Sequence, residues 1–177
     1  DYYDEMKKEL GYPDNYTATL PWAVEDYDYM KAIFKCFLRK YEQMGVDFWW
    51  LDWQQHLLVN NMTLGETFWC NHTFFEDMRT NRPELRPVIY HRWGGLGSHR
   101  YPIGFSGDTF SKWTTLGYLA YFTSNASNVC YTYWGHDIGG HQGGRNDQEL
   151  YLRWLQFGVY TPIFRTHALK SDDIERR

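Results

Sequence analysis

Residues 46–52 read Val-Asp-Phe-Trp-Trp-Leu-Asp, a mostly apolar run that ends at the carboxylate of Asp52. A short apolar run of this kind is typical of a strand that is buried on both faces of a parallel sheet. Residues 26–44, which precede it, carry apolar side chains at three- and four-residue spacing and end before Gly45, which predicts a helix. A helix followed by a buried strand is the repeating unit of α/β proteins.

The alternation of helix and strand continues along the chain. We predict further helices over 3–10, 72–80, 109–123 and 147–158, strands over 87–91, 129–134 and 161–165, and a Gly-rich loop over 94–107. This order predicts a parallel sheet with crossover helices. No G-x-G-x-x-G motif opens a helix directly after a strand, which disfavours a dinucleotide-binding domain. The fold class that remains is α/β of the (β/α)8 TIM-barrel type, and the chain covers about four βα units of such a barrel.

Composition narrows the classes of function. The 177 residues have a net charge of −4 and no run of Lys or Arg, so we expect no nucleic-acid partner. No stretch approaches the ~18–20 apolar residues of a membrane helix, so we expect no membrane partner. Aromatic residues make up 20% of the chain, which suits sugar faces, protein partners or a large core. The chain begins without Met or a signal peptide, which predicts an excised or processed segment.

Cysteines and glycosylation motifs bear on the compartment. No C-x-x-C occurs, which excludes common zinc and redox motifs. The three cysteines, Cys36, Cys70 and Cys130, can form one disulfide and one free thiol or can all be free thiols, and the sequence leaves both alternatives open. N-x-S/T motifs, in excess of chance, favour a secreted or extracellular protein; they start at Asn15, Asn61, Asn71 and Asn125. We expect Asn125 at the buried end of a helix, where it would be a poor acceptor.

Polar side chains follow each predicted strand. In chain order these are Asp52, Arg92, Asp108, Asp137 and His167. Because the carboxyl ends of parallel strands lie at one end of a barrel, we expect these side chains to converge there. Two carboxylates among tryptophans, Asp52 and Asp108, suggest glycoside hydrolysis, in which one attacks the anomeric carbon and the other protonates the leaving oxygen.

Several of these residues have structural alternatives. An Asp after a strand is often a helix cap, and Asp108 directly precedes a predicted helix. Asp137 precedes Ile-Gly-Gly and fits a turn. His136 and His141 are five residues apart, unlike the common metal-binding spacings, so we expect no metal site.

Several motifs, in order along the chain, resemble those of glycoside hydrolase family 31, a family of α-glucosidases and α-xylosidases. The family's Trp-Ile/Leu-Asp-Met-Asn-Glu is similar to residues 50–55, Trp-Leu-Asp-Trp-Gln-Gln. Its Arg-Ser stretch and its Trp-x-Gly-Asp resemble Arg92-Trp93 and residues 105–108, Phe-Ser-Gly-Asp. Its Asp-Ile-Gly-Gly-Phe is similar to residues 137–141, where His141 replaces Phe. Its Arg-Trp-x-Gln and Arg-x-His are similar to residues 153–156 and 165–167.

The resemblance implies a retaining α-glycosidase in which Asp52 is the nucleophile and Asp108 the general acid and base. It implies sugar-hydroxyl contacts from Arg92, Asp137 and His167. Candidates for stacking on the sugar, each with a core role as its alternative, are Trp50, Trp53 and Trp134. The implied partner is an oligosaccharide or glycoside substrate, and no cofactor or metal is implied. Glucose, galactose, xylose and N-acetylhexosamine remain open as the sugar.

On this interpretation residues 1–177 are part of one catalytic barrel: 1–24 form a loop-rich lead-in, 25–168 the βα units and 169–177 a tail. The remaining barrel strands and β domains of the parent protein are expected partners. The segment alone has open sheet edges, which predicts low activity or aggregation. Two alternatives remain, an inactive barrel remnant that only binds carbohydrate and a metal-dependent barrel hydrolase.

Overall fold

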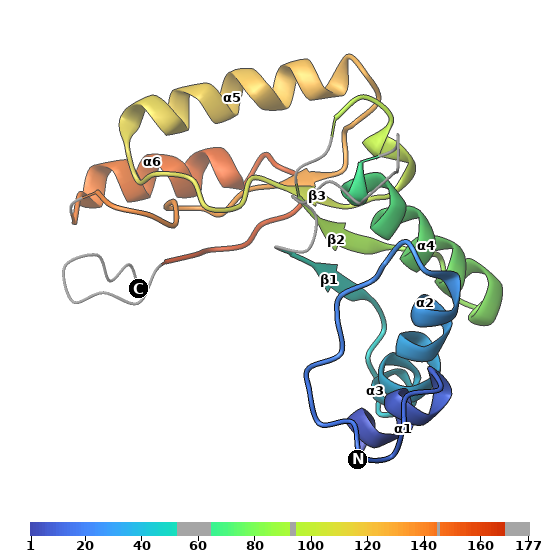
Figure 1. Cartoon of the computed structure of the whole chain (residues 1–177). Helices are drawn as coiled ribbons and strands as arrows, with labels where there is room; N and C mark the ends of the chain where they lie inside the picture. The colour runs from blue at the N-terminus through green and yellow to red at the C-terminus, as the bar shows by residue number, and fades with distance from the viewer. Residues whose placement is uncertain (53–64, 93–94, 145, 169–177) are drawn as a thin grey trace. The chain divides into compact units, whose positions relative to one another are not determined.

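The computed structural model describes residues 1–52, 65–92, 95–144 and 146–168, and the chain forms two compact units, Asp1–Pro87 and Val88–Arg177. Helices and short strands alternate along the chain (Figure 1), as the sequence predicts. Within the described ranges, no helix is long and apolar enough to cross a membrane.

The first unit is mainly helical. Its elements are α1 (Tyr2–Glu9), α2 (Tyr27–Ile33), a π-helical turn (Phe34–Leu38), α3 (Arg39–Gln43), β1 (Trp49–Leu51) and α4 (Glu66–Asn81). The helix predicted over 26–44 is therefore one helical run with a π-turn in its middle. Asp26 caps this run, because its carboxylate accepts from the backbone N–H groups of Asp28 and Tyr29 at 2.8 and 3.2 Å. Helix α4 begins at Glu66, earlier than predicted, and the buried Glu66 carboxylate accepts from Trp22 Nε1 at 2.8 Å.

Strand β1 is shorter than the predicted strand over 46–51. The backbone carbonyls of Val46 and Asp47 each accept from Arg82 Nη1 at 3.0 Å, so the chain there bonds to the side chain of the residue that directly follows α4. Leu51 is buried, but Trp50 is 49% exposed, so the prediction of burial on both faces was wrong for Trp50.

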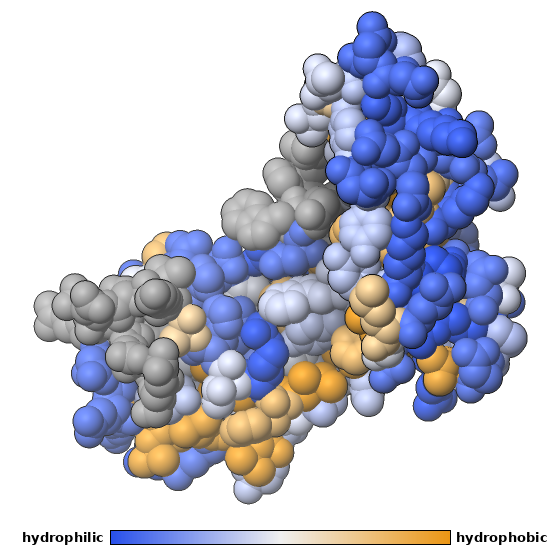
Figure 2. All heavy atoms as spheres, turned by 90° about the horizontal axis from the view of Figure 1, so that it is seen from below, coloured by the Kyte–Doolittle hydropathy of each residue, from blue (hydrophilic) through white to orange (hydrophobic). Residues whose placement is uncertain are grey.

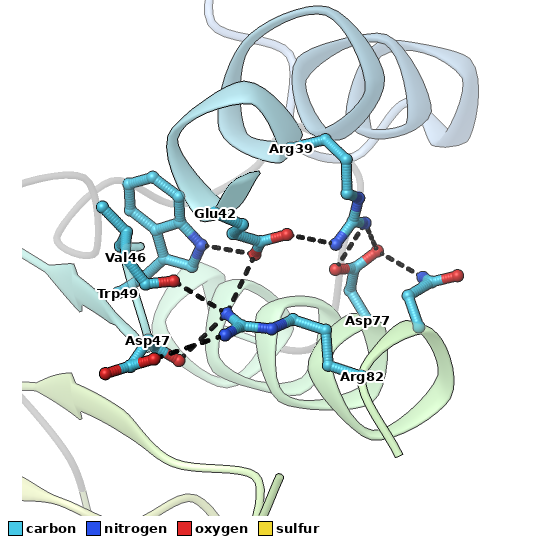
Figure 3. A network of polar contacts seen from close by, with 8 residues as sticks. Arg39, Glu42, Val46, Asp47, Trp49, Asp77 and Arg82 are labelled. Atoms are coloured by element: carbon cyan, nitrogen blue, oxygen red, sulfur yellow. Dashed lines mark hydrogen bonds and ion pairs between the residues drawn. The ribbon is translucent and has the colours of Figure 1, made fainter. Parts of the chain in front are cut away.

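A polar network ties β1 to the helices of the first unit (Figure 3). The Glu42 carboxylate accepts from Trp49 Nε1 at 2.9 Å and from Arg39 Nη1 at 2.5 Å. Arg39 also donates to both oxygens of Asp77, at 2.7 and 2.8 Å. Arg82 lies 3.8 Å from Glu42, whose side chain is only 5% exposed. The strand that leads to Asp52 is thus held by charged groups largely withdrawn from water.

Replacing Arg82 by alanine is expected to destabilise the first unit by about 1–3 kcal/mol, because Glu42 and two carbonyls lose a donor. The measurement is denaturant unfolding of the full-length protein, with hydrogen exchange of residues 46–51 as the local readout. The matched control is Arg79→Ala, since Arg79 lies in the last turn of α4 with an exposed side chain that pairs with Glu76. We expect a change within about 0.5 kcal/mol for the control. Equal effects of the two variants would contradict this role of Arg82.

The second unit contains a parallel sheet. Its elements are β2 (Ile89–His91), a 3-10 turn (Ser98–Arg100), β3 (Gly104–Phe105), α5 (Trp113–Ser127), β4 (Trp134–Gly135) and α6 (Gln148–Gly158). Strand β2 pairs in parallel with β3, with His91 opposite Gly104, and β3 pairs in parallel with β4, with Phe105 opposite Gly135. The predicted parallel sheet is confirmed, whereas the strand predicted over 161–165 appears as a single bridge between Gly135 and Ile163.

Strand β3 lies inside the segment that we predicted as a Gly-rich loop. A side chain at Gly104 would collide with the Trp134 ring and the Tyr131 hydroxyl, so glycine allows this strand to pack closely on β4. Helix α5 begins at Trp113, later than the predicted residue 109. The intervening backbone pairs instead with a distant segment, since Phe110 and Gln142 form a parallel bridge.

The structure decides between the two alternatives for the cysteines and corrects the expectation for Asn125. All three cysteines are free thiols, and Cys130 is exposed while Cys36 and Cys70 are buried. Asn125, expected to be buried, is exposed, whereas Asn71 is fully buried in α4. Large apolar side chains also reach the surface in both units, and Figure 2 shows such hydrophobic patches on the drawn face. Since exposed apolar groups are common on folded proteins, exposure alone does not mark a ring as sugar-binding.

Candidate active site

Asp108 lies in the loop after β3 and is paired with an arginine that follows β2. Arg92 Nη1 lies 3.0 Å from Asp108 Oδ1, and the Arg92 side chain is 3% exposed. Gly107, which directly precedes Asp108, has φ +68°, and a side chain there would collide with the Arg92 guanidinium. Helix α5 has Lys112 at its N-cap position, so Asp108 does not cap it. The structure therefore contradicts the capping alternative for Asp108.

Backbone pairing brings His141 to Asp108. The His141 N–H donates to the Thr109 carbonyl at 2.7 Å, and the Ser111 N–H donates to the Gln142 carbonyl at 2.9 Å. Gly140, at φ +77°, makes this approach possible, because a Cβ there would lie 2.9 Å from the Ser111 backbone. As a result His141 Nδ1 lies 3.9 Å from Asp108 Oδ1.

A second backbone pairing brings Arg165 and His167 to Asp137. The Ile138 N–H donates to the Arg165 carbonyl at 3.2 Å, and the His167 N–H donates to the Ile138 carbonyl at 3.0 Å. Arg165 Nη2 donates to Asp137 Oδ1, and His167 Nε2 lies 3.7 Å from Asp137 Oδ2. The two histidines of the site also meet, with His141 Nδ1 2.6 Å from His167 Nε2 and the rings stacked.

Asp137 is the most buried carboxylate of this cluster, at 2% exposure. Burial raises the pKa of Asp137 to about 6, while the charges of Arg165 and His141 act to lower this pKa. The Asp137 backbone carbonyl accepts from the Gly140 N–H at 2.8 Å and so closes a turn, as the structural alternative predicts. The Asp137 carboxylate accepts from Arg165 Nη2. Asp137 therefore joins the turn and the charged cluster.

Two aromatic rings lie next to the cluster of charged side chains. Tyr90 and Phe105 stack with centroids 4.7 Å apart. The Arg92 and Arg165 guanidinium carbons lie 5.9 and 5.5 Å from the Phe105 ring centroid. Phe105 thus provides a π-face for both cations of the site.

Four of the predicted site residues come together in the second unit, at the ends of its parallel strands: Arg92, Asp108, Asp137 and His167. Asp52 and Trp50 belong to the first unit, where Asp52 follows β1 and is partly buried. Trp53 lies outside the described residues.

The third tryptophan candidate lies in the core. Trp134 is 7% exposed and packs edge-on against Tyr131, with ring centroids 4.7 Å apart. Its surroundings therefore favour the core alternative over stacking on a sugar.

Sequence reasoning placed Arg165 at the end of the predicted strand over 161–165 but gave it no role in the site, and it gave His141 no role either. Arg165 could have been found from spacing, because it lies two residues before His167, and residues i and i+2 of an extended segment share a face. His141 could have been found as the departure from Phe in the family motif. Among the residues that the structure describes, no group of three or more His, Cys, Asp or Glu side chains could hold a metal ion.

Charged side chains that follow the carboxyl ends of parallel strands, as they do after β2, β3 and β4, occupy the place where active sites lie in (β/α)8-barrel enzymes. The chain belongs to glycoside hydrolase family 31, because the model of "Glycosyl hydrolases family 31 TIM-barrel domain" matches residues 2–177. The resemblance seen in the motifs and the predicted fold class are confirmed by this match.

Curated relatives are similar over parts of the chain. An alpha-xylosidase of Emericella nidulans is 23% identical over 145 residues, which are 76% of this chain and 18% of the relative. Neutral alpha-glucosidase C of Homo sapiens is 32% identical over 91 residues, 51% of this chain and 10% of the relative. The chain thus spans about a tenth to a fifth of the length of such relatives.

Solved structures support the fold. A family 31 dextranase of Flavobacterium johnsoniae, complexed with glucose, matches 90% of this chain and 24% of its own with a TM-score of 0.72 and 24% identity. A family 31 alpha-xylosidase from a soil metagenome, complexed with xylose, matches 97% of this chain and 30% of its own with a TM-score of 0.69 and 24% identity. At these identities the likeness supports the fold alone.

Proposed function

We propose that the chain is the catalytic segment of a retaining α-glycosidase that hydrolyses α-linked oligosaccharides or glycoconjugates by double displacement. The observation that carries the proposal is the setting of Asp108, a partly exposed carboxylate bound by the buried Arg92 and flanked by the Asp137 cluster. Family membership supports the glycosidase class, and the position of Asp52 in a Trp-Leu-Asp motif supports it as the partner carboxylate.

In the first step, the Asp52 carboxylate attacks the anomeric carbon while Asp108 donates its proton to the leaving glycosidic oxygen. The glycosidic bond breaks, and a covalent glycosyl ester forms on Asp52 with inverted configuration. In the second step, Asp108, now ionised, takes a proton from water as the water oxygen attacks the same carbon. The ester bond breaks, Asp52 is released as a carboxylate, and the product has the configuration of the substrate.

Arg92, Asp137 and His167 are proposed to hydrogen-bond the hydroxyl groups of the sugar that is cleaved. The ion pair between Arg165 and Asp137 fixes the Asp137 carboxylate before substrate arrives, which lowers the entropy cost of binding. Such bonds accelerate the reaction only where they strengthen as the sugar ring flattens toward the oxocarbenium ion. Relatives are named α-glucosidase and α-xylosidase, so we propose α-glucosides and α-xylosides as the first substrates to test.

Proton NMR of a full-length enzyme reaction tests the mechanism. With aryl α-glucoside or α-xyloside as substrate, we expect the α-anomer of the free sugar to appear first and the β-anomer to grow in later by mutarotation. Initial release of the β-anomer would mean inversion and would contradict double displacement. A chelator control separates this proposal from the metal-dependent alternative, which requires activity to fall on chelation.

A further inference from the structure

Two histidine rings are in contact in the candidate active site, at His141, where the family motif has Phe, and at His167. His141 Nδ1 lies 2.6 Å from His167 Nε2, a hydrogen-bond distance. His141 Nδ1 also lies 3.9 Å from Asp108 Oδ1, and His167 Nε2 lies 3.7 Å from Asp137 Oδ2. The histidine pair therefore lies between the two carboxylates of the second unit, beside the carboxylate proposed above as the acid.

The neighbours of His167 determine which ring nitrogens carry protons. Arg165 Nη1 lies 3.3 Å from His167 Nδ1, and a guanidinium can only donate, so His167 Nδ1 accepts and its Nε2 carries the proton. His167 Nε2–H then donates to His141 Nδ1. A proton on His141 Nδ1 would place two donors face to face, so His141 carries its proton on Nε2.

One ring N–H of the pair is left for a further acceptor, and it belongs to His141. Both ring nitrogens of His167 have protein partners, namely Arg165 and His141. Within the described residues, the hydrogen bonds of the His141 ring involve Nδ1 only, and the His141 side chain is 23% exposed. Because a donor that loses its water needs another acceptor, His141 Nε2–H suits an acceptor that the substrate supplies.

We propose that His141 is a specificity-determining residue that orients His167 through Nδ1 and donates from Nε2–H to a hydroxyl group of the sugar that is cleaved. The proposal rests on the proposed function, because that function places the substrate at Asp108. The hydroxyl contact proposed above for His167 is thereby passed on to His141. Phenylalanine, the residue of the family motif at this position, has no such donor, so His141 adds a polar contact to the site.

Substrates that lack single hydroxyl groups test this contact. His141→Phe is expected to lower kcat/KM for an aryl α-glucoside or α-xyloside by about 3–10-fold, as expected for one lost neutral hydrogen bond. Among monodeoxy analogues of that substrate, we expect one that the wild type and His141→Phe hydrolyse with equal kcat/KM, because it lacks the acceptor of His141. The difference should remain for the other analogues. An equal difference for every analogue would overturn the hydroxyl contact.

His141→Asn separates the contact with the sugar from the contact with His167. The Asn side-chain oxygen is as many bonds from Cα as His Nδ1, so it can accept from His167 Nε2–H, but Asn has no donor in the place of Nε2. We expect His141→Asn to show the same dependence on the analogue as His141→Phe. Wild-type kcat/KM in His141→Asn would limit His141 to holding His167 and would overturn its contact with the sugar.

All measurements use the full-length enzyme, with His99→Phe as the matched control because His99 is an exposed histidine of the same unit. Its kcat/KM is expected to stay within about twofold of the wild type for every analogue. Asp108→Asn is the second arm. If that variant keeps wild-type activity, the proposed function fails, and the role of His141 fails with it. If Asp108→Asn is inactive while His141→Phe equals the wild type on the parent substrate, only the role of His141 fails.

Discussion

Asp52→Ala is expected to lower kcat/KM of the full-length enzyme by about 10³-fold or more, because no other group can form the glycosyl ester. Added azide is expected to restore turnover, since the shortened side chain leaves space for a small anionic nucleophile beside the anomeric carbon. The azide would attack from the face that Asp52 uses. The product is therefore expected to be a β-glycosyl azide, of configuration opposite to that of the α-glycoside substrate.

The product mixture, read by NMR and mass spectrometry, decides this prediction. The matched control is Asp47→Asn, which changes an exposed carboxylate of the same unit and is expected to leave kcat/KM within about twofold. Wild-type turnover in Asp52→Ala would exclude Asp52 as the nucleophile. A folded, inactive variant that forms no glycosyl azide would also count against this role.

The architecture could be predicted from sequence where the signal is local. The helical spacing over 26–44 and the charged end of residues 46–52 predicted a helix and a strand, and both are observed. The ends of the predicted strands also indicated where polar groups gather, since Arg92 and Asp137 lie in one cluster. These features depend on side-chain periodicity and on the polarity of parallel sheets, which a single sequence carries.

The details of the site depend on contacts between distant segments. Strand β3 forms because Gly104 lets the chain pack under Trp134, and a Gly-rich segment by itself predicts a loop. His141 reaches Asp108 because its backbone bonds to Thr109, 32 positions away by residue number. Such pairings involve no local pattern, which is why His141 could be noticed only as a departure from the family motif.

Two buried histidines predict a loss of stability in acid. His91 is fully buried and contacts the Tyr101 carbonyl through Nε2 at 2.5 Å, and burial lowers the pKa of His91 to about 4. His136 is also fully buried, with Nε2 2.9 Å from Thr123 Oγ1. The Thr123 hydroxyl already donates to the Leu119 carbonyl, so it accepts from His136. Burial likewise lowers the pKa of His136 to about 4.

The direction of the pH effect follows from proton binding. In the unfolded chain a histidine has a pKa of about 6.5, so between pH 6.5 and 4 the unfolded state binds more protons than the folded state. The stability that each histidine contributes by being buried in its neutral form is fully present above about pH 6.5 and is lost as the pH falls toward 4. Each histidine is expected to lower the free energy of unfolding by up to about 3 kcal/mol over this range, a large share of a typical total.

Unfolding of the full-length protein by urea, repeated between pH 8 and pH 4, measures this loss. His91→Gln and His136→Gln keep a side-chain donor for Tyr101 and Thr123 but cannot take up a proton. Although each variant is expected to be less stable at pH 8, its free energy of unfolding should fall less steeply with acid than that of the wild type. His99→Gln is the control, because it replaces an exposed histidine of the same unit, and its slope should equal the wild-type slope. If His91→Gln and His136→Gln also keep the wild-type slope, the acid sensitivity arises elsewhere, and neutral burial of these two rings does not control it.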